Sequence, residues 1–192
     1  MAKKHEFRPD KPKFSLLSYL VLAPSQRRNL LKWGLYTAVL VALSVLQDVV
    51  LSKARLFGAT TELIPCAIFL ICILEGAEKG SIFSLVASLL YLFSGTAPGV
   101  YSMVAITFCA IGVCILRQAY LQERFSSAMI CTSLAMVCYV LLNFIFGLFL
   151  GLTIWSRFPG FLITAVLSLL AVPILYPLFK AIGKIGGQLW KV

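Results

Sequence analysis

The sequence predicts an all-α integral membrane protein of six transmembrane helices, with both termini in the cytoplasm. Hydrophobic residues make up 60% of its 192 residues and charged residues only 12%, whereas soluble proteins carry about 25% charged residues. The apolar residues gather into runs that are separated by short polar segments. The basic residues lie mainly in the segments expected on one side of the membrane. No soluble domain is expected between the helices.

A basic cytoplasmic segment is expected over residues 1–32. It contains one apolar run, residues 14–23, which reaches about 15 Å as a helix and is too short for the ~30 Å core of a bilayer. We interpret the run as an interfacial helix lying on an anionic membrane face. A signal peptide is the alternative, but a second basic cluster and a full-length span follow the run.

A six-helix transmembrane domain is expected over residues 33–180, followed by a basic cytoplasmic tail over residues 181–192. The spans are predicted at residues 33–51, 63–74, 81–93, 100–116, within 125–152, and at 161–179. In the last span, Pro173 is expected to introduce a kink, and Pro177 with Lys180 to end the helix.

The second and third spans form a hairpin whose first helix is short. Residues 63–74 reach about 18 Å, below the ~30 Å hydrocarbon core. This helix must thin the bilayer, extend Glu62 and Glu75 toward the interface, or be shielded by neighbouring helices. Pro65 is tolerated because a residue in the first helical turn needs no N–H donor.

The basic residues predict the orientation of the chain. With six spans, the two termini and the second and fourth loops share one side of the membrane. All 17 basic residues except Lys53, Arg55 and Arg157 lie on that side. The positive-inside rule places it in the cytoplasm. An odd number of spans would separate the two basic termini, so the bias also supports six.

Two patterns of small residues are candidates for close helix contacts. Gly80, Ser84 and Ser88 recur every four residues along the third span, and Gly147 and Gly151 form a GxxxG pair near the end of the fifth. In lipid, small residues let a second helix approach closely. Each pattern fits either packing within the chain or contact with a partner protein.

Few polar groups lie near the membrane interior. Glu75 and Glu78 are expected in a solvated turn between the second and third spans, and Asp48 and Glu62 at interfacial helix ends. Asn143 is the strongest polar group inside the fifth span. We expect it to form a hydrogen bond between helices of the chain, with contact to a ligand as the alternative.

The residue pattern argues against an enzyme, a metal site and a bound cofactor. His5 is the single histidine and lies in the basic tail, so no histidine can activate a serine or threonine in the membrane. The six cysteines lie in apolar runs without a CxxC spacing, which does not fit a zinc site. Spans three, four and six contain no ionisable residue of the kind that coupled transporters use. No basic patch interleaved with aromatic residues occurs outside the membrane flanks, so nucleic acid is not an expected partner.

Several short motifs, mostly marked by glycine or proline, occur in a recognisable order. They are LQ at residues 46–47, LFGA at 56–59, Pro65, a Glu-Gly turn at 75–76, Gly80, SG at 94–95, PGVYS at 98–102, Gly112, and AVLSLLAVPILYPLFK at 165–180. In order and spacing they resemble the bacterial rod-shape-determining protein MreD, over roughly residues 30–182.

The resemblance implies a non-enzymatic scaffold of the rod-shape (cell-wall elongation) complex in the bacterial cytoplasmic membrane. That family works with the bitopic protein MreC, the actin-like MreB, and the lateral-wall glycosyltransferase and transpeptidase. Its compact bundle has been compared with the substrate-binding subunits of vitamin transporters. The chain departs from the family at Ser84 and Ser88, where glycines are usual, and near residues 91–92, where an Asp is usual, so no role of that Asp is carried over. The basic N-terminal segment adds anionic lipid as an expected partner.

The alternative function is the substrate-binding subunit of an energy-coupling-factor vitamin transporter. Such subunits share the length, the six helices and the cytoplasmic termini, and a small-residue pair like Ala38 and Ala42 in the first span. A vitamin pocket would need convergent polar groups near the outer helix ends. The chain offers Asp48, Glu62, Tyr101 and Trp155 there.

Overall fold

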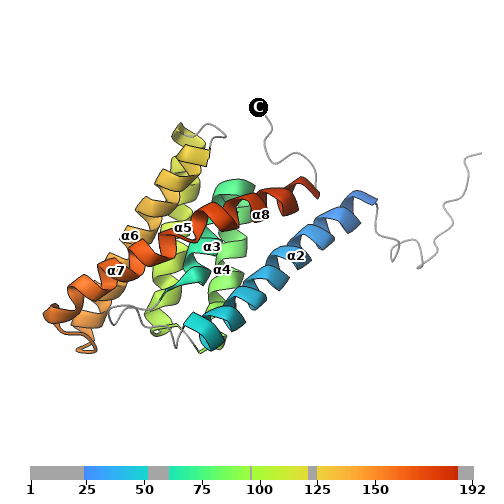
Figure 1. Cartoon of the computed structure of the whole chain (residues 1–192). Coiled ribbons are helices and arrows are strands. Elements are labelled where there is room, and N and C mark those ends of the chain that lie inside the picture. Colours follow the sequence, from blue (N-terminus) through green and yellow to red (C-terminus); the bar gives the residue numbers. More distant parts are fainter. Residues whose placement is uncertain (1–23, 52–60, 96, 121–124, 186–192) are drawn as a thin grey trace, which may run out of the picture.

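The computed structural model of this chain describes residues 24–51, 61–95, 97–120 and 125–185, which are mainly helical with no β-strand among them (Figure 1). The elements are α2 (Pro24–Leu46), the π-helical turn η1 (Gln47–Leu51), α3 (Leu63–Glu75), α4 (Ala77–Phe93), α5 (Val100–Tyr120), α6 (Phe125–Phe149), the 3-10 turn η2 (Trp155–Arg157), α7 (Phe158–Leu169) and α8 (Val172–Ile185). The all-α prediction is confirmed over these ranges.

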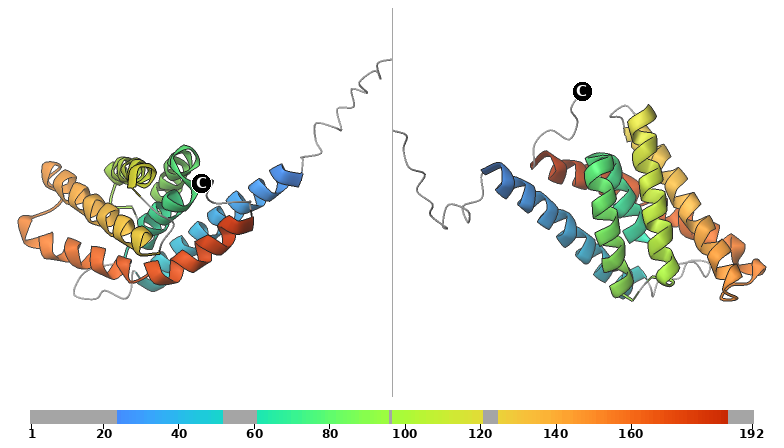
Figure 2. Two further views of the ribbon diagram at one scale, coloured as in Figure 1. Left: turned by 90° about the horizontal axis from the view of Figure 1, so that it is seen from above. Right: turned by 180° about the vertical axis from the view of Figure 1, so that it is seen from behind.

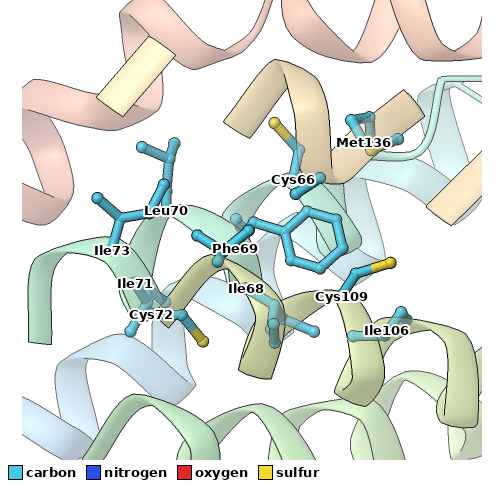
Figure 3. Close-up of a cluster of buried hydrophobic side chains, with 14 of the residues drawn as sticks. Cys66, Ile68, Phe69, Leu70, Ile71, Cys72, Ile73, Ile106, Cys109 and Met136 are labelled. Carbon is cyan, nitrogen blue, oxygen red and sulfur yellow. The ribbon is translucent and has the colours of Figure 1, made fainter. Parts of the chain in front are cut away.

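α3 lies at the centre of the bundle, and the other helices pack around it (Figures 1 and 2). Its residues 63–74 are all buried. A helix that is apolar on every face is stable only when it is covered on every face. Neighbouring helices therefore shield α3, which explains how so short a helix is accommodated. Figure 3 shows Phe69 of α3 in the same core as Ile106 and Cys109 of α5 and Met136 of α6.

The predicted hairpin is present as α3 and α4, which are joined by Gly76 alone. Gly76 has a φ of 93°, a left-handed conformation that residues with a side chain rarely adopt. The chain therefore reverses direction within one residue. α4 then follows α3 closely because Gly80 has no side chain: a Cβ there would lie 3.0 Å from the Cα of Cys72.

The first span begins earlier than predicted. α2 starts at Pro24, so Lys32 and the two arginines before it belong to this helix. Proline suits the first helical position because that residue needs no N–H donor. The helix thus crosses the predicted boundary between residues 32 and 33. The interfacial helix expected at residues 14–23 lies outside the described residues, as does most of the C-terminal tail.

The last predicted span is a bent pair of helices, α7 and α8, which meet at an angle of 47°. α7 ends at Leu169 because Pro173, four residues later, has no N–H to donate to the Leu169 carbonyl. The break therefore lies just before the proline that was expected to kink this span. Pro177, in contrast, does not end the helix, and α8 continues to Ile185. The predicted end near Lys180 is wrong.

Three helical stretches are long and apolar enough to cross a membrane: Gln26–Val49, Val100–Arg117 and Phe125–Phe149. The bent α7–α8 pair makes a fourth if its two helices form one span, whereas α3 is shorter. Helix length and composition thus suit the chain to a membrane. The count of six spans and the cytoplasmic position of both termini remain predictions.

Candidate functional site

Both ends of the central helix α3 carry an acidic residue, and polar side chains from other helices gather around each. At the C-terminal end, a Glu75 carboxylate oxygen lies 2.5 Å from Lys32 Nζ, and the other accepts a 2.9 Å hydrogen bond from the Tyr36 hydroxyl. Only 3% of the Glu75 side chain and 7% of the Lys32 side chain are exposed. We call these three residues the Glu75 cluster.

The position of Glu75 corrects the prediction of a solvated turn. Glu75 is the last residue of α3 and its side chain meets α2, whereas Glu78 in α4 is exposed. The cause lies in α2: because this helix extends back to Pro24, it places Lys32 beside the end of α3. A buried carboxylate requires such a partner, and the lysine ammonium group provides it.

Aromatic side chains surround the Glu75 cluster. The Tyr36 ring lies 5.9 Å from the Phe179 ring of α8 and 6.1 Å from the Phe83 ring of α4, centre to centre. Lys32 Nζ lies 5.5 Å from the centre of the Trp33 ring, a distance at which the ring face attracts the cation. The cluster thus connects α2, α3, α4 and α8.

The N-terminal end of α3 is fixed by side chains from two other elements. Gln47 Oε1, in η1, accepts the N–H groups of Leu63 at 2.9 Å and of Ile64 at 3.4 Å. Ser168 Oγ, in α7, accepts the N–H group of Glu62 at 2.8 Å. The first N–H groups of a helix have no partner within the helix, so these bonds cap α3.

A second group of polar side chains, the Glu62 cluster, lies at this end of α3. It consists of Glu62, Tyr91 of α4, and Tyr139 and Asn143 of α6. One buried atom of each residue has no partner among the described residues at full hydrogen-bonding geometry: Glu62 Oε2, the two tyrosine hydroxyls and Asn143 Oδ1. The Tyr139 hydroxyl nevertheless lies close enough to interact with Glu62, Tyr91 and Asn143. The Glu62 carboxylate interacts electrostatically with both tyrosines and with Tyr101 of α5. Buried polar atoms without partners are uncommon and cost about 1–3 kcal/mol each.

Burial changes the acidity of Glu62. This residue precedes α3, outside the membrane-spanning helices, and is half-buried as a whole, but its Oε2 atom is buried. Burial raises the pKa of Glu62 from 4.5 to about 7, although the nearby Tyr139 hydroxyl offsets part of this rise. A carboxyl group that titrates near neutral pH among other polar groups is typical of a functional site.

We expect Glu62 to lower the thermal stability of the detergent-solubilised protein as the pH rises from about 5 to about 8. The folded state binds the Glu62 proton more tightly than the unfolded chain does. Its contribution to stability is therefore complete below the ordinary pKa of 4.5 and is lost as the pH rises through about 7. Glu62→Gln should flatten the profile of melting temperature against pH, and Glu78→Gln, at an exposed site, should not. Identical profiles for Glu62→Gln and the wild type would contradict this assignment.

Gly80, Ser84 and Ser88 lie inside the molecule. All three are buried on the face of α4 that packs against α3 and α5. The hydroxyls of Ser88 and Thr107 are 3.3 Å apart, which links α4 to α5. This stripe is a packing surface within the chain, so it is not available to a partner protein.

Gly147 and Gly151 end a helix. The Leu152 N–H group donates to the Gly147 carbonyl at 2.9 Å, and the Gly151 N–H group donates to the Leu148 carbonyl at 3.0 Å. With Gly151 at a φ of 69°, these bonds form a Schellman motif. Apart from its chain neighbours, no described residue has an atom within 4 Å of the point where a Gly151 Cβ would stand, so no described helix packs on this glycine.

Two further predicted residues lie at the same end of α3 as Glu62. Asn143 is only 3% exposed, and its Oδ1 atom forms none of the interhelical hydrogen bonds expected of it with the described residues. Asp48, in η1, interacts electrostatically with Tyr91. The structure therefore brings together Asp48, Glu62 and Asn143, which come from three predicted spans or their ends.

Lys32, Tyr36, Tyr91 and Tyr139 do not stand out in the sequence as site residues. Lys32 is one basic residue among many, and tyrosines occur widely in apolar helices. One signal is the spacing: Lys32 and Tyr36 are four residues apart, as are Tyr139 and Asn143, so each pair shares a helix face. The spacing does not indicate what that face meets.

The part of the chain that the structure describes contains no group of three or more His, Cys, Asp or Glu side chains that could hold a metal ion. Its cysteines are free thiols, and Cys72 Sγ lies 3.2 Å from the Gly80 carbonyl oxygen. The Cys72 thiol contributes to the packing of α3 against α4.

No family model, curated protein or solved structure matches this chain. Its function is therefore proposed from its residues and their geometry.

Proposed function

We propose that this chain is a non-enzymatic membrane scaffold of the bacterial rod-shape (cell-wall elongation) complex, similar to MreD. In this role it holds MreC-type, actin-like MreB-type and wall-synthase partners together at the cytoplasmic membrane. The ordered motifs between residues 46 and 180 support the proposal. The structural observation that carries it is the uncovered outer face of α2.

α2 lies at one edge of the bundle, and no other described helix covers its outer face (Figure 2). Only 17% of its membrane-spanning stretch is buried, against 39% for α5 and 44% for α6. Gly34, Ala38 and Ala42 recur every four residues on the exposed face. Small residues let a partner helix approach the backbone, and close packing is what joins helices in lipid. A bitopic partner, which has a single transmembrane helix, fits this face.

The proposal includes six spans with both termini in the cytoplasm and a contact with anionic lipid. Arg27 and Arg28, near the start of α2, are exposed. Basic residues beside a membrane-spanning helix are attracted to the negative cytoplasmic leaflet. This attraction supports a cytoplasmic position for the start of α2.

Leucine at Ala38 and Ala42 should weaken partner binding, because the larger side chains hold the partner helix away from α2. We expect mild-detergent purification of the tagged double variant from its own cells to recover several-fold less MreC-type partner than the wild type. Val86→Leu with Val104→Leu is the control, since these residues are exposed on α4 and α5 and do not belong to α2. Equal recovery from both double variants at equal abundance would contradict the proposed role of this face.

A specific observation favours a second candidate function, the substrate-binding subunit of an energy-coupling-factor transporter. Of the polar residues expected to form a vitamin pocket, Glu62 and Tyr101 interact electrostatically with each other. Asp48 interacts electrostatically with Tyr91. Trp155 is 74% exposed and packs its ring against Phe144. In the same purification, recovery of paired ATPases with a membrane coupling subunit would support this candidate and overturn the scaffold.

A further inference from the structure

The Glu62 cluster gathers unpartnered polar atoms from three separate parts of the chain. Tyr91 on α4 is 2% exposed, and Tyr139 and Asn143 on α6 are 0% and 3% exposed. Together with Glu62 Oε2, their polar atoms lie buried near one another, and none has a partner among the described residues at full hydrogen-bonding geometry. We propose that this cluster binds an ammonium group, carried by a lipid headgroup or by a small soluble amine.

The chemistry of the cluster favours a donor over an acceptor. The N–H groups at the start of α3 already donate to Gln47 and Ser168, so the helix end offers no free donor for an anion. The atoms without partners are a carboxylate oxygen, an amide oxygen and two hydroxyls. The first two only accept hydrogen bonds when the carboxyl is ionised, and each hydroxyl donates one hydrogen bond but can also accept, so the acceptor positions outnumber the two donors. An ammonium group has three donors and no acceptor, so it matches them.

Charge also favours a cation. A buried carboxylate is costly unless an opposite charge pairs with it. None of the described lysine and arginine side chains forms an ion pair with Glu62. The three tyrosines with which Glu62 interacts add aromatic rings, whose faces attract cations. When Glu62 is ionised, a neutral ligand or a water molecule would leave its negative charge uncompensated.

The opposite end of α3 contains an arrangement of the same kind with its cation in place. There the Glu75 carboxylate and the Tyr36 hydroxyl are hydrogen-bonded, and Lys32 supplies an ammonium group 2.5 Å from the carboxylate. At the Glu62 end, a carboxylate and tyrosine hydroxyls are again buried together. The described chain supplies no ammonium group to Glu62 there, and a ligand would complete the pairing.

A small cavity adjoins the cluster and provides room for the apolar part of such a ligand. Its volume is about 80 Å³, and it lies between α2, α3 and α4. Tyr91 belongs to both the cavity wall and the Glu62 cluster, and Ile64 lines the cavity at the start of α3. Val41 and Leu90, also in the wall, are 50% and 42% exposed, so the cavity lies close to the lipid-facing surface.

The first test is the thermal stability of the full-length protein in mild detergent. Ethylammonium chloride should raise the melting temperature with saturation, because a ligand that binds only the folded state stabilises it. Tetramethylammonium chloride at the same concentration carries the same charge but no N–H donor, so it should raise the melting temperature much less. Equal shifts from the two salts would overturn the proposal, since they would reflect ionic strength alone.

Variants locate the effect in the cluster. Glu62→Gln should raise the apparent dissociation constant for ethylammonium by at least about tenfold, because it removes the charge that pairs with the ligand. Glu78→Gln, which removes an exposed carboxylate at the other end of α3, should leave the constant unchanged. If Glu62→Gln does not fold, Tyr91→Phe removes only one hydroxyl and should also weaken binding. Unchanged binding in the folded variants would overturn the assignment.

A measurement of bound lipid distinguishes the two sources of the ammonium group. Native mass spectrometry of the wild type in nanodiscs with equal phosphatidylethanolamine and phosphatidylglycerol should show retention of the aminolipid if a headgroup is the ligand. An ethylammonium shift without retained aminolipid would identify a soluble amine. The absence of both an ethylammonium shift and a retained aminolipid would overturn the proposal. The amount of partner recovered with the Glu62→Gln variant measures the scaffold function separately, because none of the four cluster residues belongs to α2.

Discussion

Lys32→Met is expected to reduce the free energy of unfolding by about 3–5 kcal/mol, because it leaves a buried carboxylate without its counter-ion. Lys32 is 5% exposed, and its Nζ atom contacts Glu75 at the end of α3. The hydrogen bond from Tyr36 would remain, but a hydroxyl group cannot neutralise the charge. Chemical unfolding of the purified protein in detergent, followed by circular dichroism, measures the loss.

Two further variants separate the ion pair from the loss of a positive charge in general. Lys79→Met removes a lysine that is exposed, so its effect should stay within about 0.5 kcal/mol. Adding Glu75→Leu to Lys32→Met should recover much of the stability, because two apolar groups can replace a buried ion pair at little cost. If Lys32→Met and Lys79→Met behave alike, the ion pair does not stabilise the fold.

Gly80→Val is expected to cost about 1–3 kcal/mol or more, because the added side chain has no space between α3 and α4. A Cβ atom at Gly80 would lie 3.0 Å from the Cα and 3.1 Å from the carbonyl oxygen of Cys72. Both are backbone atoms of the central helix, which neighbours pack on every side. They cannot move aside as a flexible side chain could, so the two helices must separate. Melting temperature and yield after membrane extraction report this separation.

Gly112→Val is the matched control for Gly80→Val. Gly112 lies in α5, and apart from its own helical turn no described residue has an atom within 4 Å of the point where its Cβ would stand. Valine and glycine both have lower helix propensity than alanine, so Gly112→Val changes the helix propensity of α5 only slightly. We expect near-wild-type stability from it. Similar losses of stability in Gly80→Val and Gly112→Val would show that the close approach of α4 to α3 is not the reason why a side chain at position 80 is destabilising.

The positions of the helices are largely local properties, and the sequence predicts them well. α3 starts at Leu63 and α5 at Val100, as their apolar runs indicate, and α6 lies within the predicted range. In a membrane, backbone groups must pair within the chain, so an uninterrupted apolar run forms a helix. The end of the last helix was harder to predict. Pro177 is accommodated inside α8, and its tolerance depends on the surroundings of the helix.

The partners of the polar and small residues depend on the tertiary structure. Periodicity shows that Gly80 and Ser88 share a face, but both a neighbouring helix and a separate protein can fill it. Glu75 adjoins a polar turn in the sequence, yet its carboxylate is buried because α2 brings Lys32 beside it. The GxxxG spacing at Gly147 is equally ambiguous, since helix packing and helix termination use the same glycines.

The sequence by itself determined that the chain is helical and suited to a membrane, because hydropathy and helix length depend on residues that are neighbours in the sequence. Only the tertiary structure decided that α3 is the buried centre, that Lys32 neutralises Glu75 at one of its ends, and that Glu62, Tyr91 and Asn143 meet at the other. Contacts between residues far apart in the chain depend on how whole helices pack. That packing is set by side-chain fit on several faces at once, which no single stretch of sequence contains.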